Sequence, residues 1–242
     1  MTGSAEAPVY SLACQGRSHA GRVRPDNQDS FALAAERGIA AVADGMGGHD
    51  SGRQVADLAV AALCRVSPAA SLEGTVERAR AALNDANGKV WRSAHQHSRT
   101  MGATLAAAVV DRGRLAVIWA GDSRAYAFRD GFLYRLTRDH SAISDLIDAG
   151  RLAPSKAATH PLRHVVTRAV GAAETLEIEV GYHSLCHGDL VLLSTDGLHG
   201  AISEDEIERC LDDHRMDALD PLIETALAAG APDNVTAVLL EV

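Results

Sequence analysis

Residues 40–49 read AAVADGMGGH, and this stretch decides how the rest of the chain is interpreted. The apolar residues 40–43 predict a buried strand that ends at Asp44. The three glycines that follow allow a backbone course that a ligand can approach closely. A lone Asp-Gly pair usually marks a turn, so this motif alone does not predict a site.

An apolar run with an aspartate at one end recurs three times further along the chain. Two of these runs end at an aspartate, and the last begins just after one. Folding that gathers the four ends would place four carboxylates together. The aspartates are Asp44, Asp122, Asp196 and Asp233.

Such a cluster of carboxylates needs compensation. Two unit charges about 4 Å apart repel by about 4 kcal/mol near a protein surface, and several such pairs would compete with the stability of a whole domain. Oxygen-only ligands favour hard divalent cations such as Mg²⁺ and Mn²⁺ over zinc. We therefore hypothesise that the four aspartates bind such ions, which would activate water and clamp a phosphoryl group.

Length and composition narrow the class of protein. The chain has 242 residues without a linker-like segment, which predicts a single domain over 1–242. The net charge of −9 argues against nucleic acid as a partner. No apolar run approaches the length of a membrane span, and the first 15 residues do not resemble a secretory signal. The four widely spaced cysteines predict reduced thiols and a cytoplasmic location.

Periodicity predicts many short strands and two pairs of helices. Tight turns between successive strands indicate antiparallel pairing. We expect an α+β fold in which a central β-sandwich of two antiparallel sheets is flanked by pairs of helices, in the order α-β-β-α. Helices are expected over 51–66, 72–97, 204–211 and 220–230. Strands are expected over 9–14, 31–33, 38–43, 102–110, 114–120, 125–129, 132–136, 176–182, 190–194 and 235–242.

Two further segments, 139–171 and 22–30, are predicted to lie outside the regular strands and helices. Residues 139–171 have little apolar periodicity and are interpreted as a surface excursion that forms a mobile flap. Arg24 lies in a polar loop over 22–30, and its guanidinium would suit a phosphate, although a solvated loop is the simpler interpretation. A zinc site at His183, Cys186 and His187 is disfavoured, because no second cluster completes it.

Six motifs in order resemble the metal-dependent Ser/Thr protein phosphatases of the 2C type (the PPM family), bacterial branch. The resemblance covers residues 12–242. The motifs are RPDNQD at 24–29, DGMGGH at 44–49, GDSR at 121–124, TRAVG at 167–171, STDGL at 194–198 and DNVT at 233–236.

The resemblance implies a dinuclear Mn²⁺ or Mg²⁺ centre at one end of the sandwich. Asp44 would bridge both ions, the Gly45 carbonyl would join one, and Asp196 and Asp233 would complete the other. Asp122, with Asp196, matches the third-metal site of bacterial members. Arg24 matches the phosphate-binding arginine, and the flap matches the subdomain that shapes substrate choice. The supporting residues would be Gln28, Asp29 and Asn234.

Two positions depart from the family pattern. Gln28 replaces a glutamate that supports a metal-bound water in many members, which predicts weaker binding of that ion. Met46 replaces the histidine proposed as general acid in eukaryotic members. His49 is a candidate proton donor, although it is equally well explained as a residue at the start of a helix.

These observations predict a phosphatase that hydrolyses phosphoserine and phosphothreonine by direct attack of a metal-activated water. The expected partners are phosphorylated proteins and a cognate bacterial Ser/Thr kinase, with the chain acting as a monomer. One alternative is a phosphatase of the same fold acting on a small phosphate ester or on a regulator of a sigma-factor pathway. Another is a non-catalytic regulatory domain, which usually lacks a metal-binding aspartate.

Overall fold

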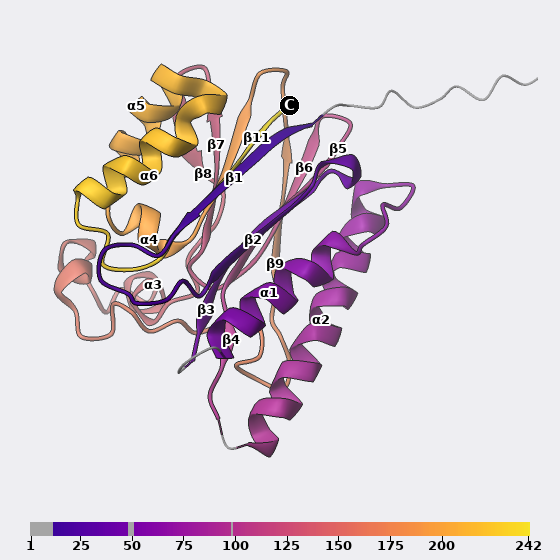
Figure 1. The fold of residues 1–242 in the computed structure, drawn as a ribbon, viewed down its shortest axis with the longest axis vertical. Helices are drawn as coiled ribbons and strands as arrows, with labels where there is room; N and C mark the ends of the chain where they lie inside the picture. Colours follow the sequence, from indigo (N-terminus) through magenta and orange to yellow (C-terminus); the bar gives the residue numbers. More distant parts are fainter. Residues whose placement is uncertain (1–11, 48–50, 98) are drawn as a thin grey trace, which may run out of the picture.

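The structure is a computed structural model that describes residues 12–47, 51–97 and 99–242. Its elements form four layers, with two antiparallel sheets face to face and helices on both outer faces (Figure 1). This arrangement confirms the predicted α+β sandwich. Within the described residues, no helix is long and apolar enough to cross a membrane.

The strands are divided between the two sheets in an order that differs from their order in the chain. The first sheet runs β1 (Ala13–His19), β11 (Val235–Glu241), β10 (Leu190–Ser194), β7 (Arg124–Arg129) and β8 (Phe132–Arg135). The second runs β2 (Asp29–Ala34), β3 (Ile39–Met46), β5 (Leu105–Asp111), β6 (Arg114–Ala120) and β9 (Glu179–Ser184), with β4 (Gly102–Ala103) paired to β3.

The helices cover the outer faces of both sheets (Figure 1). The second sheet packs against α1 (Ser51–Cys64) and α2 (Leu72–Gln96). The first sheet packs against α4 (Asp196–His199), α5 (Glu204–His214) and α6 (Leu219–Ala228). The remaining helix, α3 (Ala142–Asp148), belongs to the predicted flap. Short 3₁₀ helices occupy Ala35–Arg37, Pro154–Thr159 and Arg215–Ala218.

Strand β3 shows why the central strands read as continuous apolar runs. Ile39, Ala41 and Ala43 face the helices, whereas Ala40 and Val42 face the opposite sheet. Successive side chains of a strand point to opposite faces, so a strand that is covered on both faces has no polar positions. Burial on both sides therefore explains the sequence signal.

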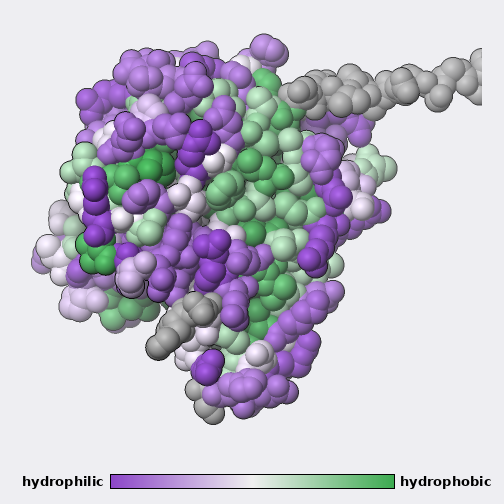
Figure 2. Space-filling view, in the orientation of Figure 1, coloured by the Kyte–Doolittle hydropathy of each residue, from purple (hydrophilic) through white to green (hydrophobic). Residues whose placement is uncertain are grey.

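The core between the two sheets contains several alanines. Ala40, Ala106 and Ala108 come from the second sheet and Ala125 from the first. This core reaches the surface where the edge strands β1 and β2 lie side by side, and Figure 2 shows a band of apolar surface there. Leu33 of β2 is 37% exposed in this region.

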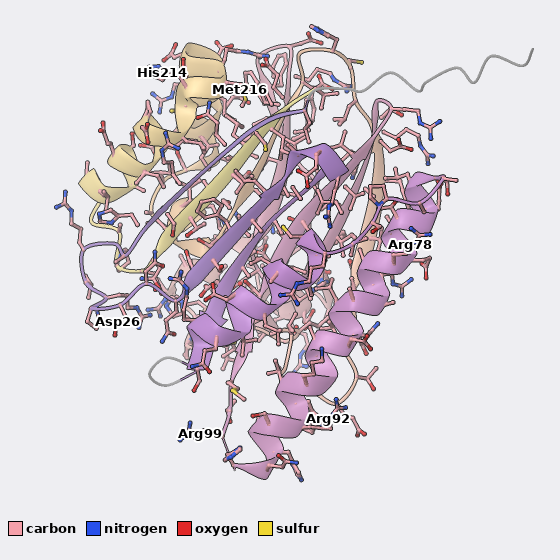
Figure 3. All side chains as sticks on the ribbon, turned by 45° about the vertical axis from the view of Figure 1, so that its right-hand side comes forward. Asp26, Arg78, Arg92, Arg99, His214 and Met216 are labelled. Atoms are coloured by element: carbon pink, nitrogen blue, oxygen red, sulfur yellow. The ribbon has the colours of Figure 1, made fainter. Side chains whose placement is uncertain are left out.

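The predicted helices form with the expected buried faces. The stripe predicted for α2 is buried from Leu72 to Ala94. Its first turn is capped by the Ser71 side chain, which accepts a hydrogen bond from the Gly74 N–H at 3.1 Å. On the outer face of α2, Arg78 and Arg92 point away from the sheets (Figure 3). Helix α5, expected over 204–211, begins with a capping box formed by Ser203 and Glu206.

The first strand lies later in the chain than predicted. Residues 9–11 of the predicted strand lie outside the described residues, and the strand runs from Ala13 to His19. As an edge strand it is only half-buried, so it lacks an apolar pattern. The Phe31 ring of β2 lies across Gly16, where an added Cβ would be 2.3 Å from the ring. Packing contributed by a neighbouring strand thus replaces an apolar side chain of β1.

Strands β9 and β3 illustrate how strand boundaries differ from the prediction. Strand β9 begins at Glu179 instead of residue 176, because its partner β6 ends one residue after Trp119, with which Glu179 pairs. Strand β3 continues past Asp44 to Met46, and Gly45 pairs with Ala103 of β4. Asp44 therefore lies within the strand and not at its end.

The segment predicted to be a flap leaves the sandwich after β8. Its two ends pair with each other through the bridge between Ser141 and Val166, and Val170 pairs with Ala103. Helix α3 ends at Asp148, two residues before Gly150, which has a φ of +67°. The mobility of this segment and the single-domain organisation of the chain stay predictions.

Candidate metal centre

The structure brings together the four predicted metal ligands at one end of the sandwich. Asp44 lies in β3, Asp122 between β6 and β7, Asp196 at the start of α4, and Asp233 just before β11. The Asp44 carboxylate repels those of the other three and that of Asp29. Four carboxylates that are distant from Asp44 in the sequence therefore lie within electrostatic range of it.

These ligands come from both sheets. Strand β3, which carries Asp44, belongs to the second sheet, whereas Asp196 and Asp233 flank strands β10 and β11 of the first. Asp29 is the register partner of Asp44 on the neighbouring strand β2. The candidate centre therefore lies where the ends of the two sheets meet.

Asp44 is held by its neighbour Thr104, between β4 and β5. The Thr104 N–H donates to the Asp44 carbonyl at 2.9 Å, and the Asp44 N–H donates to Thr104 Oγ1 at 3.3 Å. The Thr104 hydroxyl also lies 2.6 Å from the hydroxyl of Ser123. Because Ser123 follows Asp122, this buried pair of hydroxyls connects the strand of Asp44 to the turn of Asp122.

A second buried pair, Thr195 and Thr236, lies beside Asp29 and Asp196. The Thr195 hydroxyl donates to Asp29 Oδ2 at 2.8 Å and accepts a hydrogen bond from the Thr236 N–H at 3.0 Å. Thr195 is fully buried and directly precedes Asp196. The same threonine thus orients one carboxylate and connects strands of both sheets.

Two glycines allow the acidic segments to pack closely. A Cβ added to Gly197 would lie 1.8 Å from the Asn234 carbonyl oxygen, so α4 can approach the start of β11 only with glycine at this position. A Cβ added to Gly45 would lie 2.3 Å from the backbone of Gly52 in α1. The glycine motif after Asp44 thus serves close packing of β3 against α1, in addition to the predicted turn.

Burial and mutual repulsion raise the pKa values of four carboxyls of the centre, those of Asp29, Asp44, Asp122 and Asp196. Burial is the largest cause for each of them, followed by the neighbouring carboxylates for Asp44 and Asp122. The pKa of Asp44 is raised well above its usual range. The pKa values of Asp29 and Asp122 are raised to about 7. The pKa of Asp196 is also raised, by burial and by Asp233.

The residues present fit a site for divalent cations. Among the residues that the structure describes, Asp29 Oδ1 and Asp196 Oδ1 are buried oxygens without a hydrogen-bond partner. Buried carboxylate oxygens are normally satisfied by a donor or a cation. The raised pKa values show that the fully ionised cluster lacks enough positive charge. Oxygen donors of this kind match Mg²⁺ or Mn²⁺.

The described residues do not supply a complete coordination shell by themselves. Within the part of the chain that the structure describes, no three His, Cys, Asp or Glu side chains are already placed to hold one ion. This includes His183, Cys186 and His187, so the disfavoured zinc site has no support. Mg²⁺-like ions usually keep several waters and bind one or two carboxylates, which is compatible with this arrangement.

Arg24 lies beside the carboxylates. It forms two hydrogen bonds to Asp233, with Nε and Nη2 at 2.9 and 2.8 Å from the carboxylate oxygens. More than half of its side chain is exposed, at 56%. The loop of Arg24 also contains Asp26, which is labelled at the edge of the molecule in Figure 3. The guanidinium thus lies within reach of both solvent and the acidic cluster.

Asn234 holds that loop in place. Its Nδ2 donates to the carbonyls of Ala20 and Asp26, both at 2.9 Å, and its Oδ1 accepts from the Gln28 N–H at 2.8 Å. The Gln28 carbonyl in turn accepts from the Gly45 N–H at 3.2 Å. Asn234 and Gln28 therefore connect the arginine loop to the strand of Asp44, and their roles toward an ion stay predictions.

Two predicted elements of the site have different outcomes. His49, the candidate proton donor, lies outside the described residues. The flap contributes neighbours to the carboxylates, since Asp139 repels Asp122 and His164 lowers the pKa of Asp196. A cavity of about 260 Å³ lies between α3 and residues 167–177, and none of the five aspartates lines it.

Several residues around the centre were not predicted. Four of them carry a hydroxyl group and one is a histidine, and they lie on segments whose sequence predicts apolar strands or turns. Thr104 is a polar residue within the apolar run 102–110, and this contrast is the feature of the sequence that could have revealed it. His199 of α4 hydrogen-bonds Ser194 at 3.0 Å and the main chain of Asp122. The residues are Thr104, Ser123, Thr195, Thr236 and His199.

Comparison with known proteins identifies relatives over nearly the whole chain. The family model described as protein phosphatase 2C matches residues 15–240. The Ser/Thr protein phosphatase PstP of Mycobacterium tuberculosis is 34% identical over 234 residues, which is 96% of this chain. The chain spans 45% of the length of that relative.

Solved structures of similar proteins share the same architecture. PppA, described as a regulatory component of the type VI secretion system of Pseudomonas aeruginosa, has a TM-score of 0.88 and 36% identity, over 96% of this chain and 98% of that one. The catalytic domain of PstP in complex with two manganese ions has a TM-score of 0.84 and 33% identity, over 95% and 97%.

Proposed function

This chain belongs to the protein phosphatase 2C family, and from that premise we propose that it is a metal-dependent phosphatase that hydrolyses phosphoserine and phosphothreonine in proteins. The main support is the convergence of Asp44, Asp122, Asp196 and Asp233, together with the unpartnered oxygen of Asp196. The non-catalytic alternative has no such support, because all four aspartates are present and clustered.

The residues of the centre have distinct proposed roles. Asp44 would bridge two ions, with the Gly45 carbonyl, Asp196 and Asp233 as further ligands, and Asp122 would serve a third. When bound, two divalent cations supply a water of lowered pKa and neutralise the phosphoryl oxygens. The PstP catalytic domain, a relative of this chain, contains two manganese ions.

The protein itself would bind and orient the phosphoryl group. Arg24 presents a planar pair of donors that suits phosphate oxygens. Thr104 holds the main chain of Asp44 and Thr195 orients the Asp29 carboxylate, which keeps this part of the site organised before the substrate arrives. The exposure of Arg24 indicates that the site opens to solvent, as a bulky protein substrate requires.

The physiological context belongs to the same proposal. Relatives of this chain are bacterial Ser/Thr protein phosphatases, so we expect its substrates to be phosphorylated proteins and a cognate Ser/Thr kinase. All four cysteines are free, which supports a reducing compartment such as the cytoplasm. We further propose that the chain acts as a monomer and as one domain.

Alanine variants of the centre test the proposal. Asp44→Ala and Asp233→Ala should lower Mn²⁺-dependent hydrolysis of an aryl phosphate by about a hundredfold or more, because several kcal/mol of charge stabilisation are lost. Asp85→Ala on the exposed face of α2 is the matched control and should retain full activity. Near-normal turnover of either centre variant would refute the assignment.

The substrate class needs a separate measurement. Rates on phosphoserine and phosphothreonine peptides should exceed those on small phosphate esters at equal concentration. The reverse order would favour the alternative of a small-ester phosphatase, and an inactive wild-type protein with normal Mn²⁺ binding would favour the non-catalytic alternative.

A further inference from the structure

His140 is a buried histidine at the base of the flap that the proposed mechanism does not use. Its side chain is 1% exposed, and its ring stacks on Trp119 with centroids 5.9 Å apart and an interplanar angle of 10°. The Trp119 Nε1–H donates to the Arg138 carbonyl at 2.9 Å, which fixes the indole. The imidazole therefore has one defined orientation.

Both the side chain and the main chain of His140 bind Gly121, the residue before Asp122. The Gly121 N–H donates to His140 Nδ1 at 3.1 Å, and the His140 N–H donates to the Gly121 carbonyl at 2.9 Å. Gly121 has a φ of +114°, and an added Cβ would lie 2.6 Å from Thr104. A single residue thus fixes the unusual backbone conformation from which Asp122 extends.

The other ring nitrogen of His140 faces charged groups on two elements. His140 Nε2 lies 3.2 Å from Glu179 Oε1 of β9 and 3.2 Å from Arg168 Nη1. Arg168 also pairs with Glu179 at 2.9 Å. Because Nδ1 must accept from Gly121, the hydrogen of the neutral ring is on Nε2 and points to Glu179. Burial and Arg168 lower the pKa of His140, which keeps the ring neutral.

The main chain of His140 also holds the returning end of the flap. Its carbonyl accepts from the Thr167 N–H at 2.8 Å, and the next residues pair as Ser141 with Val166. On its other side, Asp139 forms a bidentate pair with Arg124 at 3.1 and 2.8 Å. The turn of Asp122 and both ends of the flap are therefore connected through one short segment.

From these contacts we infer that His140 is a positioning residue that sets the Asp122 carboxylate for its ion and couples that position to the flap. This inference rests on the proposed function, because it concerns the ion bound by Asp122 and Asp196. His140 does not touch the reacting groups. It acts through the Gly121 peptide, and its effect should be specific to the Asp122-dependent ion.

Three substitutions separate the contacts of the ring. In His140→Asn, the amide oxygen can replace Nδ1 as the acceptor for Gly121. In His140→Gln, the longer side chain can reach Glu179 but leaves the Gly121 N–H unpaired. His140→Phe keeps the stacking on Trp119 and removes both hydrogen bonds. Asp122→Ala serves as the reference that removes the ion directly.

Calorimetric titration with Mn²⁺ provides the first readout. We expect the Asp122-dependent binding step to weaken about tenfold in His140→Gln and His140→Phe, to stay near normal in His140→Asn, and to disappear in Asp122→Ala. The steps that depend on Asp44 and Asp233 should not change. If Asp122→Ala alters no step, the proposed metal site fails; if only Asp122→Ala alters the step, the role of His140 fails.

Hydrogen exchange and NMR of the metal-free protein provide readouts that do not depend on any ion. The Gly121 amide should exchange at least about tenfold faster in His140→Gln than in His140→Asn. In the wild type, ¹⁵N shifts should show His140 with an unprotonated Nδ1, a measurement that remains decisive if a variant fails to fold. A protonated Nδ1, or equal exchange at Gly121 in the two variants, would overturn the inference.

Discussion

Arg24 binds the same carboxylate that is proposed to bind a metal ion, since its guanidinium forms two hydrogen bonds to Asp233. The side chains are 56% and 36% exposed, so solvent screens the pair, which contributes about 1 kcal/mol or less. In the metal-free protein, Arg24, which is proposed to bind phosphate, is thus held weakly by Asp233, which is proposed to bind a metal ion. Metal binding should relieve Asp233 of that role and leave Arg24 available to an anion.

Arg24→Ala should therefore separate phosphate binding from metal binding. We expect KM for an aryl phosphate to rise about tenfold or more, because a charge-assisted bidentate contact is lost. Affinity for Mn²⁺ should stay equal or increase up to about fivefold, because the competing pair of about 1 kcal/mol is gone. Kinetics and calorimetry measure the two effects. Arg22→Ala in the same loop is the control, and equal losses of both affinities in Arg24→Ala would indicate a purely structural role.

Asp29→Asn should stabilise the metal-free protein in alkaline solution. Asp29 has a pKa raised from 3.8 to about 7, so the folded state binds more protons than the unfolded state between these values, and stability falls as pH rises through this range. The neutral amide removes that loss. In EDTA, the Tm of the variant should match the wild type near pH 4 and exceed it by on the order of 10 °C at pH 8, since a pKa difference of about 3 corresponds to about 4 kcal/mol.

The comparison between variant and wild type cancels other titrating groups. His199, whose pKa is lowered, destabilises both proteins equally in acid. If the difference in Tm between variant and wild type did not change with pH, ionisation of Asp29 would not destabilise the folded protein, and the prediction would be wrong. The stabilised variant should also gain less from Mn²⁺, because the centre then carries one fewer negative charge.

Addition of Mn²⁺ should stabilise the wild type more strongly at pH 7.5 than at pH 5.5. Protons compete with the ion for carboxyls such as Asp122, whose pKa is about 7. At a concentration a hundredfold above Kd the ion contributes about 2.7 kcal/mol, which corresponds to roughly 5–10 °C in Tm. Thermal unfolding with Mn²⁺ or EDTA at both pH values measures the difference. An equal gain at both pH values would contradict binding through these carboxyls.

Gly197→Ala should damage both the fold and the metal centre. The new Cβ would lie 1.8 Å from the Asn234 carbonyl oxygen, so α4 must move away from the start of β11. We expect a loss of stability above about 3 kcal/mol in denaturant unfolding, together with loss of Mn²⁺ binding. Gly88→Ala within α2 is the matched control and should stabilise by about 0.5–1 kcal/mol. Its Cβ would meet only the flexible end of the Arg92 side chain.

The sequence predicted the parts of the fold that are covered on both faces. Strands such as β6 and β10 carry unbroken apolar runs, and α2 carries a regular stripe, so their positions follow from periodicity. The half-buried strand β1 had no such pattern. Its packing depends on Phe31 from another strand, and that contact exists only after the chain has folded.

The acidic residues of the centre were predictable, whereas their supports were not. Each aspartate stands beside an apolar run, where a charge is conspicuous. Thr195 and His140 act through hydrogen bonds to residues more than 15 positions away, at 2.8 and 3.1 Å. Neither residue type nor local spacing identifies such partners. The ion pair of Arg24 with Asp233 was likewise visible only in three dimensions.

Because the candidate metal ligands lie on two different sheets, the distance between the sheets affects the geometry of the proposed metal centre. Ala40, Ala106, Ala108 and Ala125 lie in the core between the sheets, and the spacing of the sheets affects how far Asp44 stands from Asp196 and Asp233. A larger side chain among these alanines would wedge the layers apart and misalign the acidic groups many residues away. Selection for activity at the metal centre would then also act on the volume of core side chains that no substrate contacts.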